Sequence, residues 1–439
     1  MNIAIVGCGY VADHYMETLS NHDNLSLQGV VDLDRSRAEI LAGYYGTRAY
    51  ANTEEVLADP AVEIVVNLTD PDNHYAVSRA SLLAGKHVYS EKPLAPDLEQ
   101  ARELVALAQE KQLLISSAPC SALSETAQTL WKAVEDGAVG RPRLVYAELD
   151  DNPVYRMKPE GWTNARGVPW PYLNEYEVGC TLEHAGYYLT WLAAIFGPAT
   201  SITAFSSCQV PDKTPLPLDR GDTPDLSVAC ILFKSGVVAR LTCSIVAPYD
   251  HRLRIIGDKG MLAVDECWQY GAPVYLERFS QMSLNARKFR SIRTSTFWSR
   301  LFGIGGRRQV FVSKPRSQCR ARWNDLKTGR RSLIGTLIKA LGKRELVAMD
   351  FFRGVAEMAR SLEENRPCQL SPDFVLHVNE MTLAMQNAST HSNTYRLTTT
   401  FEPIAQASAT RDSAHNYADA RPGRVASLFE SLIARLHKH

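Results

Sequence analysis

The chain has 439 residues, of which 45% are hydrophobic and 22% are charged, and its acidic and basic side chains balance to a formal net charge of zero. This length allows two domains with substantial cores, and the apolar content is typical of a globular protein. No apolar run is long enough to cross a bilayer, and the first residues already read as a strand rather than a cleavable signal. Nine cysteines, odd in number and without a C-x-x-C pair, argue against a disulfide framework and against a zinc site. We therefore expect a reduced, cytoplasmic protein without a metal.

The neutral total hides a basic block. Between Arg278 and Arg344 there are eighteen Lys or Arg residues and one acid, Asp325. We interpret this block as an insertion whose apolar stripes resemble a helix lying on an anionic membrane surface. A solvated, partly disordered insertion, contact with an acidic neighbouring subunit and binding of an anionic substrate are the alternatives. Nucleic acid is not expected as a partner, because no motif that reads it accompanies the charge.

Residues 1–121 alternate short apolar strands with helical patterns. Such alternation is typical of a parallel sheet covered by helices on both faces, an α/β fold. A ligand would then bind at the carboxyl ends of the strands. The expected strands are 2–6, 27–32, 64–67, 87–89 and 113–116.

The first of these strands runs into a glycine turn. Gly7, Gly9 and Ala12 have the G-x-G-x-x-A spacing that lets backbone N–H groups and a helix N-terminus hold a pyrophosphate. Asp32 ends the second strand, where a carboxylate can accept hydrogen bonds from an adenosine ribose. The combination predicts a dinucleotide-binding (Rossmann) domain, with cofactor contacts from Gly7, Gly9, Tyr10, Val11, Ala12 and Asp32.

Asp32 also bears on which dinucleotide binds. No basic residue follows it directly, and its carboxylate would repel a 2′-phosphate, so NAD is favoured over NADP. Arg35, directly after Asp34, could accommodate the 2′-phosphate of NADP, so NADP remains the alternative.

The pattern changes near Ser124. A helix at 125–136 precedes extended runs at 144–149, 200–206, 227–233, 237–246 and 253–256, several of them joined by short turns. This arrangement predicts a second, α+β domain with a large, mostly antiparallel open sheet. We assign residues 122–402 to it, with the basic insertion at about 278–344, and residues 403–439 to a polar tail with a terminal amphipathic helix.

Four phrases resemble the glucose-fructose oxidoreductase / inositol dehydrogenase / MocA family. They are GKHVYSEKPLA around Lys92, VVNLTDPDNH at 65–74, GCTLEHAG from Gly179 and IIGDKGMLAV at 255–264. The likeness covers about residues 1–277 and resumes near 346–400. It implies hydride transfer between a nicotinamide and a hydroxyl-bearing carbon, and an open sheet whose exposed face builds a homo-oligomer.

The resemblance also implies roles in the first domain. Lys92, between Glu91 and Pro93, would lie beside the nicotinamide and the reacting carbon, where a cation can support developing alkoxide charge. Glu91, Thr69 and His74 would lie near the cofactor. For His74 the alternative is a polar residue that only begins a helix.

The helix near Gly179 departs from the family pattern of an Asp followed four residues later by a His. Anchoring on Gly186 places His184 and Tyr188 at those two positions. We therefore assign proton exchange to Tyr188, with its pKa lowered by a nearby lysine, and a supporting role to His184. Glu183 and Tyr187 form a second pair four residues apart, which would face the substrate if this register were wrong by one; His184 would then be a core histidine.

An aromatic segment, residues 150–176, precedes this helix and is expected to be a long loop. Trp162, Trp170 and Tyr172 could stack on a sugar ring, or could form a local cluster that fastens the loop. Asn174 and Glu175 are candidate hydroxyl-binding groups. The sequence thus predicts an NAD(P)-dependent oxidoreductase acting on a ring hydroxyl or ketone of a sugar, cyclitol or nucleotide-sugar. A non-catalytic dinucleotide-binding sensor or scaffold and an NAD-dependent glycosidase are the alternatives.

Overall fold

The computed structural model describes residues 1–164, 166–280, 349–390 and 394–404, together with residues 284, 290, 291, 295, 297 and 308–310. Most of the basic insertion and the tail after residue 404 lie outside these ranges. The expected membrane contact and terminal amphipathic helix therefore fall on residues that are not described. Within the described ranges, no helix combines the length and hydrophobicity needed to span a bilayer.

The first 118 residues, all described, form a five-stranded parallel sheet with the order β2-β1-β3-β4-β5. Its strands are β1 (Asn2–Val6), β2 (Ser26–Val31), β3 (Ile64–Asn67), β4 (His87–Ser90) and β5 (Ile115–Ser117). Each predicted strand is present, with ends that differ by at most two residues. Every residue of β3 is buried, as expected for a parallel strand covered on both faces.

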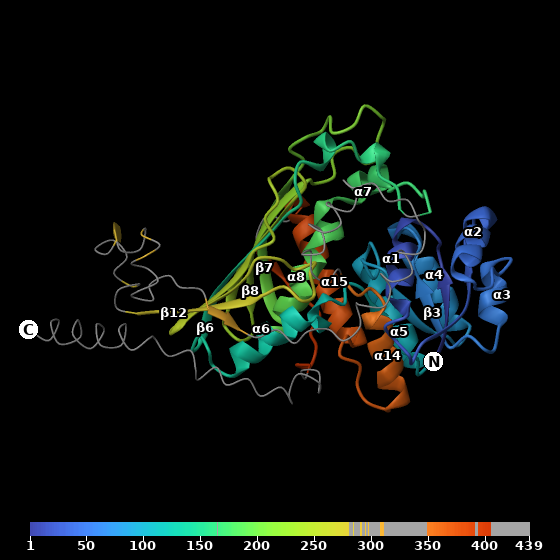
Figure 1. The fold of residues 1–439 in the computed structure, drawn as a ribbon, viewed down its shortest axis with the longest axis horizontal. Helices are drawn as coiled ribbons and strands as arrows, with labels where there is room; N and C mark the ends of the chain where they lie inside the picture. The colour runs from blue at the N-terminus through green and yellow to red at the C-terminus, as the bar shows by residue number, and fades with distance from the viewer. Residues whose placement is uncertain are drawn as a thin grey trace, which may run out of the picture.

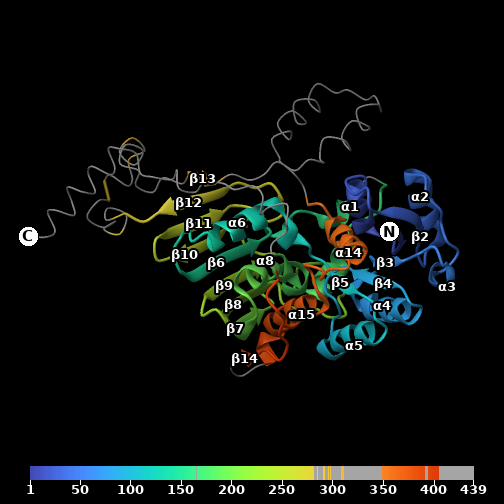
Figure 2. The same ribbon diagram turned by 90° about the horizontal axis from the view of Figure 1, so that it is seen from below.

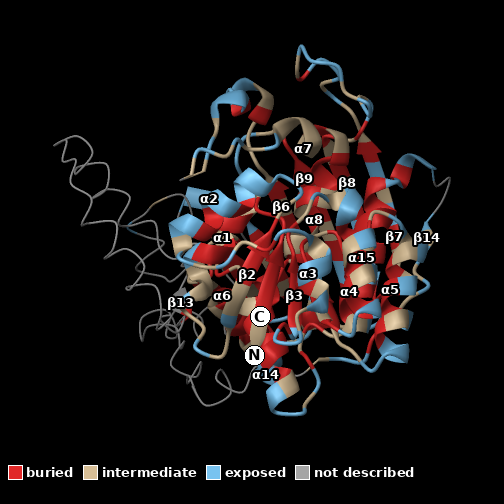
Figure 3. Cartoon of the chain, turned by 90° about the vertical axis from the view of Figure 1, so that its right-hand side faces the viewer, coloured by how far each residue is buried: buried red, intermediate tan, exposed pale blue. Residues whose placement is uncertain are grey.

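Helices connect these strands and cover the sheet (Figure 1). They are α1 (Tyr10–Leu19), α2 (Arg35–Tyr45), α3 (Thr53–Ala58), α4 (His74–Leu83) and α5 (Leu98–Glu110). Figure 3 shows buried strands at the centre of this layer and helices whose outer faces are exposed. The predicted α/β fold of the first domain is confirmed.

The second sheet has nine strands among the described residues, in the order β13-β12-β11-β10-β6-β9-β8-β7-β14. Its pairings are antiparallel except for β6 beside β9, so the predicted mostly antiparallel sheet is confirmed. The strands are β6 (Pro142–Asp150), β7 (Ala199–Ser207), β8 (Leu226–Phe233), β9 (Val238–Ser244), β10 (Leu253–Gly257), β11 (Gly260–Val264), β12 (Val274–Arg278), β13 (Arg308–Val310) and β14 (Tyr395–Arg396).

Helices pack on one face of this sheet (Figure 2). They are α6 (Glu125–Glu135), α8 (Cys180–Phe196) and α15 (Pro372–Gln386), and α14 (Arg353–Glu363) contacts the parallel sheet. Along β8, buried residues alternate with more exposed ones, which is the pattern of a sheet covered on one side only. Helices α8 and α15 lie between the two sheets (Figure 1), so residues of α8 are placed next to the carboxyl ends of the parallel strands.

The segment 150–176 is more ordered than the expected long loop. It contains two short 3-10 turns (Val154–Arg156 and Pro159–Gly161) and a hairpin closed by a bridge between Thr163 and Pro169. Its last five residues already belong to α7 (Tyr172–Val178), so the loop prediction is wrong there. A helix of seven residues is too short to show a clear helical period in the sequence.

Candidate active site

A cavity of about 360 Å³ opens between the carboxyl ends of the parallel strands, α8 and the hairpin. Its volume is in the range of small-molecule sites. Both domains contribute walls. Of the residues singled out from the sequence, those lining it are Gly9, Tyr10, Val11, Thr69, His74, Glu91, Lys92, Trp162, Trp170, Asn174, Glu183, His184 and Tyr187.

The glycine turn between β1 and α1 forms one end of this cavity. Gly7 has φ +100°, and a Cβ there would lie 2.5 Å from the Leu68 carbonyl oxygen, so only glycine fits. Gly9 caps α1 and has open space around the position of a Cβ. A free helix N-terminus with room above it fits the pyrophosphate of a dinucleotide. Ala12 is buried and does not line the cavity, so its part is close packing of the helix.

Asp32 is held beside the turn. Its Oδ2 accepts a hydrogen bond from the Cys8 N–H at 2.7 Å, and its Oδ1 accepts one from the Asp34 N–H at 2.8 Å. Arg35, which kept NADP possible, donates to Glu39 on its own helix at 2.8 Å. The arrangement leaves a carboxylate, rather than a cation, at the end of β2.

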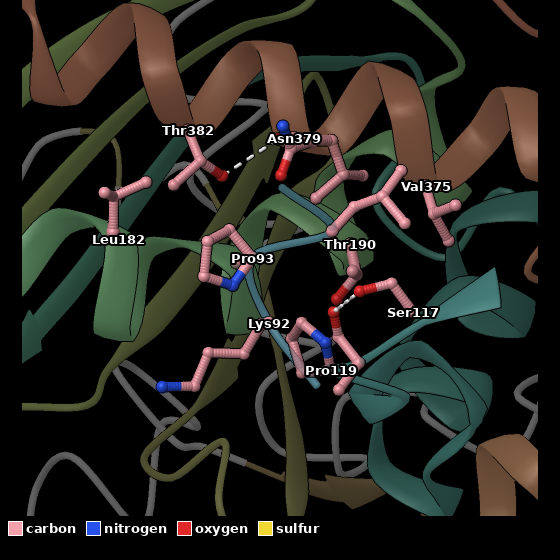
Figure 4. A pocket seen from close by; sticks show the side chains of 13 residues that line it. Lys92, Pro93, Ser117, Pro119, Leu182, Thr190, Val375, Asn379 and Thr382 are labelled. Carbon is pink, nitrogen blue, oxygen red and sulfur yellow. Dashed lines mark hydrogen bonds between the residues drawn. The ribbon is translucent and has the colours of Figure 1, made fainter. Parts of the chain in front are cut away.

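Lys92 stands on a turn that is fixed from three sides. The Glu91 carboxylate accepts from the Tyr15 hydroxyl at 2.8 Å, a ring nitrogen of His74 lies 2.7 Å from the Pro93 carbonyl, and Asn379 of α15 donates to the Ala95 carbonyl at 3.1 Å. Figure 4 shows Pro93 in the small hollow behind this turn, with the Lys92 side chain leading away from the α15 residues Val375 and Asn379.

The Lys92 ammonium forms an ion pair with Glu183 of α8, so this contact joins the two domains within the cavity.

His74 borders the cavity, but its ring is used elsewhere. It is fully buried, and its second nitrogen lies 2.9 Å from the Thr69 carbonyl. Burial lowers the pKa of the imidazole. The His74 ring lies between the Thr69 and Pro93 carbonyls and so positions the two loops around it. The residue also lines the cavity, so its predicted place near the cofactor stays a prediction.

Helix α8 presents Glu183, His184 and Tyr187 to the cavity. Tyr188 is fully buried, packs edge-on against Trp191, and donates its hydroxyl hydrogen bond to the His251 carbonyl. Burial raises its pKa well above the ordinary value, where a lowered pKa was expected. Tyr188 does not line the cavity, and its hydroxyl is bonded to a backbone carbonyl, so the structure does not support proton exchange by this residue. The cavity face of α8 carries Glu183 and Tyr187 together with His184, so neither predicted register holds in full.

His184 is not a core histidine. Its Nε2 lies 4.0 Å from Oδ2 of Asp151, the residue after β6. Burial, followed by the charges of Lys92 and His251, lowers the pKa of His184 to about 3, and burial raises the pKa of Asp151 to about 6. His184 is thus a neutral hydrogen-bonding group at physiological pH.

The aromatic residues of the hairpin divide into two groups. Trp162 and Trp170 lie with ring centroids 4.9 Å apart and line the cavity together. Tyr172 does not line it and packs edge-on against Tyr176, with ring centroids 5.8 Å apart. Tyr172 therefore fits the second alternative of the sequence analysis, a local cluster, and does not line the cavity that would hold the substrate.

The lining residues to which the sequence analysis gave no role include His14, Asp151, Trp268, Met349 and Phe351. Trp268 sits between two of the helix residues, with ring centroids 5.9 Å from His184 and 5.8 Å from Tyr187. For Asp151 the sequence offered one indication of a functional role, its place at the end of a predicted strand. The other four residues come from segments far apart in sequence, and no sequence pattern marked them.

Comparison with known proteins agrees with this architecture. Residues 1–118 match the model of an oxidoreductase family with an NAD-binding Rossmann fold, and residues 127–263 match the model of the GFO/IDH/MocA C-terminal domain.

Two curated relatives show the level of similarity. Trans-1,2-dihydrobenzene-1,2-diol dehydrogenase of Bos taurus is 28% identical over 273 residues, which cover 60% of this chain and 74% of the relative. Inositol 2-dehydrogenase/D-chiro-inositol 3-dehydrogenase of Lactiplantibacillus plantarum is 24% identical over 268 residues, which cover 59% of this chain and 70% of the relative.

Solved structures share the fold at low identity. Aldose-aldose oxidoreductase from Caulobacter crescentus, complexed with glycerol, superposes with a TM-score of 0.65 at 17% identity, covering 90% of this chain and 99% of the other. The WlbA dehydrogenase from Bordetella pertussis, in complex with NADH and UDP-GlcNAcA, superposes with a TM-score of 0.60 at 16% identity. The superposition covers 90% of this chain and 97% of the other.

Proposed function

Because the chain belongs to the GFO/IDH/MocA family of NAD-binding oxidoreductases, we propose that it interconverts a ring hydroxyl and a ring ketone of a sugar, cyclitol or nucleotide-sugar. One observation carries the proposal. Lys92, Glu183 and Tyr187 line the same cavity, and that cavity reaches the glycine turn at Gly9.

The residues around the turn fit a dinucleotide. The backbone at Gly9, Tyr10 and Val11 would hold the pyrophosphate at the N-terminus of α1. Asp32, which is bonded to the turn through the Cys8 N–H, would accept from the adenosine ribose. When bound, the nicotinamide supplies the hydride acceptor or donor that no side chain can provide.

Each polar side chain then has one task. Lys92 stabilises the negative charge that develops on the reacting oxygen, and Glu183 holds the ammonium in place through their ion pair. Tyr187 exchanges the proton of the hydroxyl. Burial, followed by the nearby Glu91 carboxylate, raises the pKa of Tyr187, so its hydroxyl is protonated at neutral pH and donates to a ketone when the ketone is reduced. In the reverse direction the tyrosinate accepts the proton of the substrate hydroxyl, so oxidation of the alcohol is favoured at higher pH.

The proposed substrate class rests on the aromatic residues of the cavity and on the names of two related enzymes. Trp162 and Trp170 offer aromatic surface against which the apolar face of a sugar or cyclitol ring can pack. The dehydrogenases of Bos taurus and Lactiplantibacillus plantarum are named for a cyclic diol and for inositol, both of which are rings with at least two hydroxyl groups.

Assembly and location complete the proposal. The uncovered face of the large sheet exposes a row of apolar side chains, Leu144, Val238 and Leu232, on neighbouring strands, which suits an interface between two copies of the chain.

The cysteines in the described ranges are unpaired, as a reducing compartment would keep them, so we place the reaction in the cytoplasm.

The test is Lys92→Met, with Lys111→Met on the exposed end of α5 as the matched control. Oxidation of myo-inositol, D-glucose and related polyols with NAD+ should fall about 100-fold or more in Lys92→Met, because one charge-stabilising group is lost. NADH binding, followed by fluorescence titration, should persist. Unchanged turnover would eliminate the role of Lys92.

The same assay separates the alternatives. NADH binding by the wild-type chain without hydride exchange across the panel would favour a sensor. Release of sugar from a glycoside without net NADH formation would favour a glycosidase.

A further inference from the structure

A cysteine, a lysine and an aspartate meet at one end of the β7–β8 pair of strands. Cys208 follows β7 directly, Asp225 precedes β8 directly, and Lys213 lies in the segment between them. The Lys213 ammonium donates to the Cys208 sulfur at 3.5 Å, and its nitrogen lies 3.3 Å from Oδ2 of Asp225. None of these three residues lines the main cavity, so the proposed reaction does not use them.

The Asp225 carboxylate fixes the lysine and the cysteine in this relation. Its Oδ1 accepts a hydrogen bond from the Gln209 N–H at 2.6 Å, and its Oδ2 accepts one from the Val210 N–H at 2.9 Å. The chain from Cys208 to Lys213 therefore wraps around a single carboxylate. The side chains of Lys213 and Asp225 are only 2% and 1% exposed, and burial of a lysine removes most of its rotamer freedom. The amine is thus held toward the sulfur.

Cys208 differs from most other cysteines in its accessibility. It is partly exposed, so a small oxidant can reach its sulfur. Six others are buried, and burial raises the pKa of their thiols: Cys8, Cys120, Cys180, Cys243, Cys267 and Cys368. Cysteines that react with peroxides are partly exposed and lie beside a cation, whereas buried thiols are inert. Among the cysteines of the described ranges, Cys208 alone has a lysine hydrogen-bonded to its sulfur.

The sulfur and the nitrogen are already close enough to react. Their separation of 3.5 Å is within the range of about 3–3.5 Å that is typical of atoms poised to form a bond. The two other hydrogen-bonding neighbours of the sulfur are oxygens, on the Gly221 carbonyl and the Asp225 carboxylate, each at 3.7 Å. Lys213 therefore supplies the nitrogen that an oxidised Cys208 would meet.

We propose that Cys208 and Lys213 form a reversible sulfur–nitrogen cross-link, a sulfenamide, when a peroxide oxidises Cys208. In the first step a sulfur–oxygen bond forms, the oxygen–oxygen bond breaks, and the thiol becomes a sulfenic acid with release of one water. The sulfur loses two electrons, and the peroxide gains them.

The second step uses the lysine and the aspartate. Lys213 passes one proton to the Asp225 carboxylate and attacks the sulfur as a free amine. The sulfur–nitrogen bond forms, the sulfur–oxygen bond breaks, and the hydroxyl leaves with a proton of the amine as a second water. Sulfenic acids condense with nitrogen in this manner, and thiols reduce the product.

The cross-link would act on the start of α8. Close to Asp225, the Thr223 hydroxyl donates to the Glu177 carbonyl at 3.0 Å, and the Cys180 N–H donates to the Pro224 carbonyl at 3.2 Å. Oxidation would therefore fasten the β7–β8 segment beside the helix that carries Glu183. The inference does not depend on the proposed function, because the cross-link forms without a substrate or cofactor.

The test is mass spectrometry of the full chain after treatment with hydrogen peroxide and digestion with trypsin in the absence of thiols. Trypsin cleaves after a free lysine and not after a cross-linked one. We expect a peptide that spans Cys208 and Lys213 without cleavage and that is lighter by two hydrogen atoms. Dithiothreitol should restore both the mass and the cleavage.

Three variants locate the chemistry. Cys208→Ser should abolish the cross-link. Lys213→Arg keeps a cation beside Asp225, but a guanidinium stays protonated and does not attack the sulfur, so the cross-link should fall about tenfold or more. Cys230→Ser, which removes an exposed cysteine on β8, should form as much cross-link as the wild-type chain.

Three results would overturn the proposal. One is cleavage after Lys213 in the oxidised wild-type chain to the same extent as in the untreated chain. Another is a Cys208 that carries only added oxygen or a disulfide to another cysteine. The third is equal formation of the cross-link in a chain unfolded in guanidinium chloride, which would show that closeness in sequence, and not the arrangement around Asp225, brings the two groups together.

Discussion

Arg166, in the hairpin between Trp162 and Trp170, donates from Nε to Oδ1 of Asp13 in α1 at 2.6 Å, and the two side chains are only 1% and 2% exposed. The guanidinium also donates to the carbonyls of Cys8 and Gly9 at 3.1 and 3.3 Å. The hairpin that supplies the aromatic wall of the cavity is thereby fastened to the glycine turn.

Arg166→Met tests the importance of this contact. The substitution leaves Asp13 as an uncompensated buried charge, and breaking a buried pair in this way typically costs about 3–5 kcal/mol. Urea denaturation should show a loss of that size, and NADH titration should show weaker binding. Arg156→Met, at an exposed arginine of the same segment, should change neither quantity; equal stability of the two variants would contradict the role of Arg166.

Tyr187 and Tyr188 give the second prediction. Tyr187→Phe should lower turnover about 100-fold or more, because the proton-exchanging hydroxyl is lost, with little change in stability. Tyr188→Phe should leave the His251 carbonyl without its donor and cost about 1–3 kcal/mol of stability, with turnover near the wild-type value. Steady-state kinetics and urea denaturation of both variants test this assignment. A large loss of turnover in Tyr188→Phe, with near-normal turnover in Tyr187→Phe, would assign proton exchange to Tyr188 instead.

The same pair shows where sequence reasoning stops. The glycine turn, the parallel strands and the Glu91-Lys92-Pro93 phrase are local patterns, and the sequence was sufficient to identify the fold and the cofactor end of the cavity from them. Which face of α8 meets the cavity depends on packing against β9 and α15, and a single residue of register moves each side chain by about 100° round the helix.

The substrate end of the cavity was harder to predict for a related reason. Asp151, His184 and Trp268 meet from three segments that are remote in sequence, and only the tertiary fold brings them together. For Tyr172 the aromatic character was correctly noted, but its partner is Tyr176, one helical turn away. Aromatic residues near a site pack on each other as readily as on a ligand.

Asp32 governs the third prediction, the preference for NADH over NADPH. Its carboxylate is fixed by the N–H groups of Cys8 and Asp34, and Arg35 is turned toward Glu39. A 2′-phosphate would meet the negative charge of Asp32, and the nearby Arg37 is already paired with Asp34 at 3.6 Å. Asp32→Ser should reduce the ratio of NADPH to NADH dissociation constants about tenfold or more in fluorescence titration, whereas Asp23→Ser, at an exposed acid beyond the far end of α1, should not. A wild-type chain that binds NADPH more tightly would contradict this assignment.

The fourth prediction concerns Asp151 and pH. Burial raises its pKa from 3.8 to about 6, so between these values the native state binds more protons at this site than the unfolded state. Stability from this group is therefore full below about pH 4 and is lost as the pH rises through 6, by up to about 3 kcal/mol.

Asp151→Asn removes that dependence. The variant should match the wild-type chain near pH 4 and exceed it in urea-denaturation free energy near pH 7, with Asp212→Asn as the control that shows no such divergence. A difference that stays constant between pH 4 and pH 7 would show that Asp151 is not a buried acid with a raised pKa.

The uncovered face of the large sheet carries the last prediction. Leu144, Val238 and Leu232 are paired across β6, β9 and β8 and are 38%, 37% and 42% exposed, a contiguous apolar row on an otherwise mixed surface. A stable interface buries about 800 Å² on each partner, and a charge at its centre has to be desolvated without a counter-ion. Leu232→Glu should therefore convert a homodimer to a monomer in light-scattering chromatography at micromolar concentration. Leu216→Glu, at an exposed leucine outside the sheet, should leave the dimer intact, and a wild-type chain that elutes as a monomer under these conditions would rule out this interface.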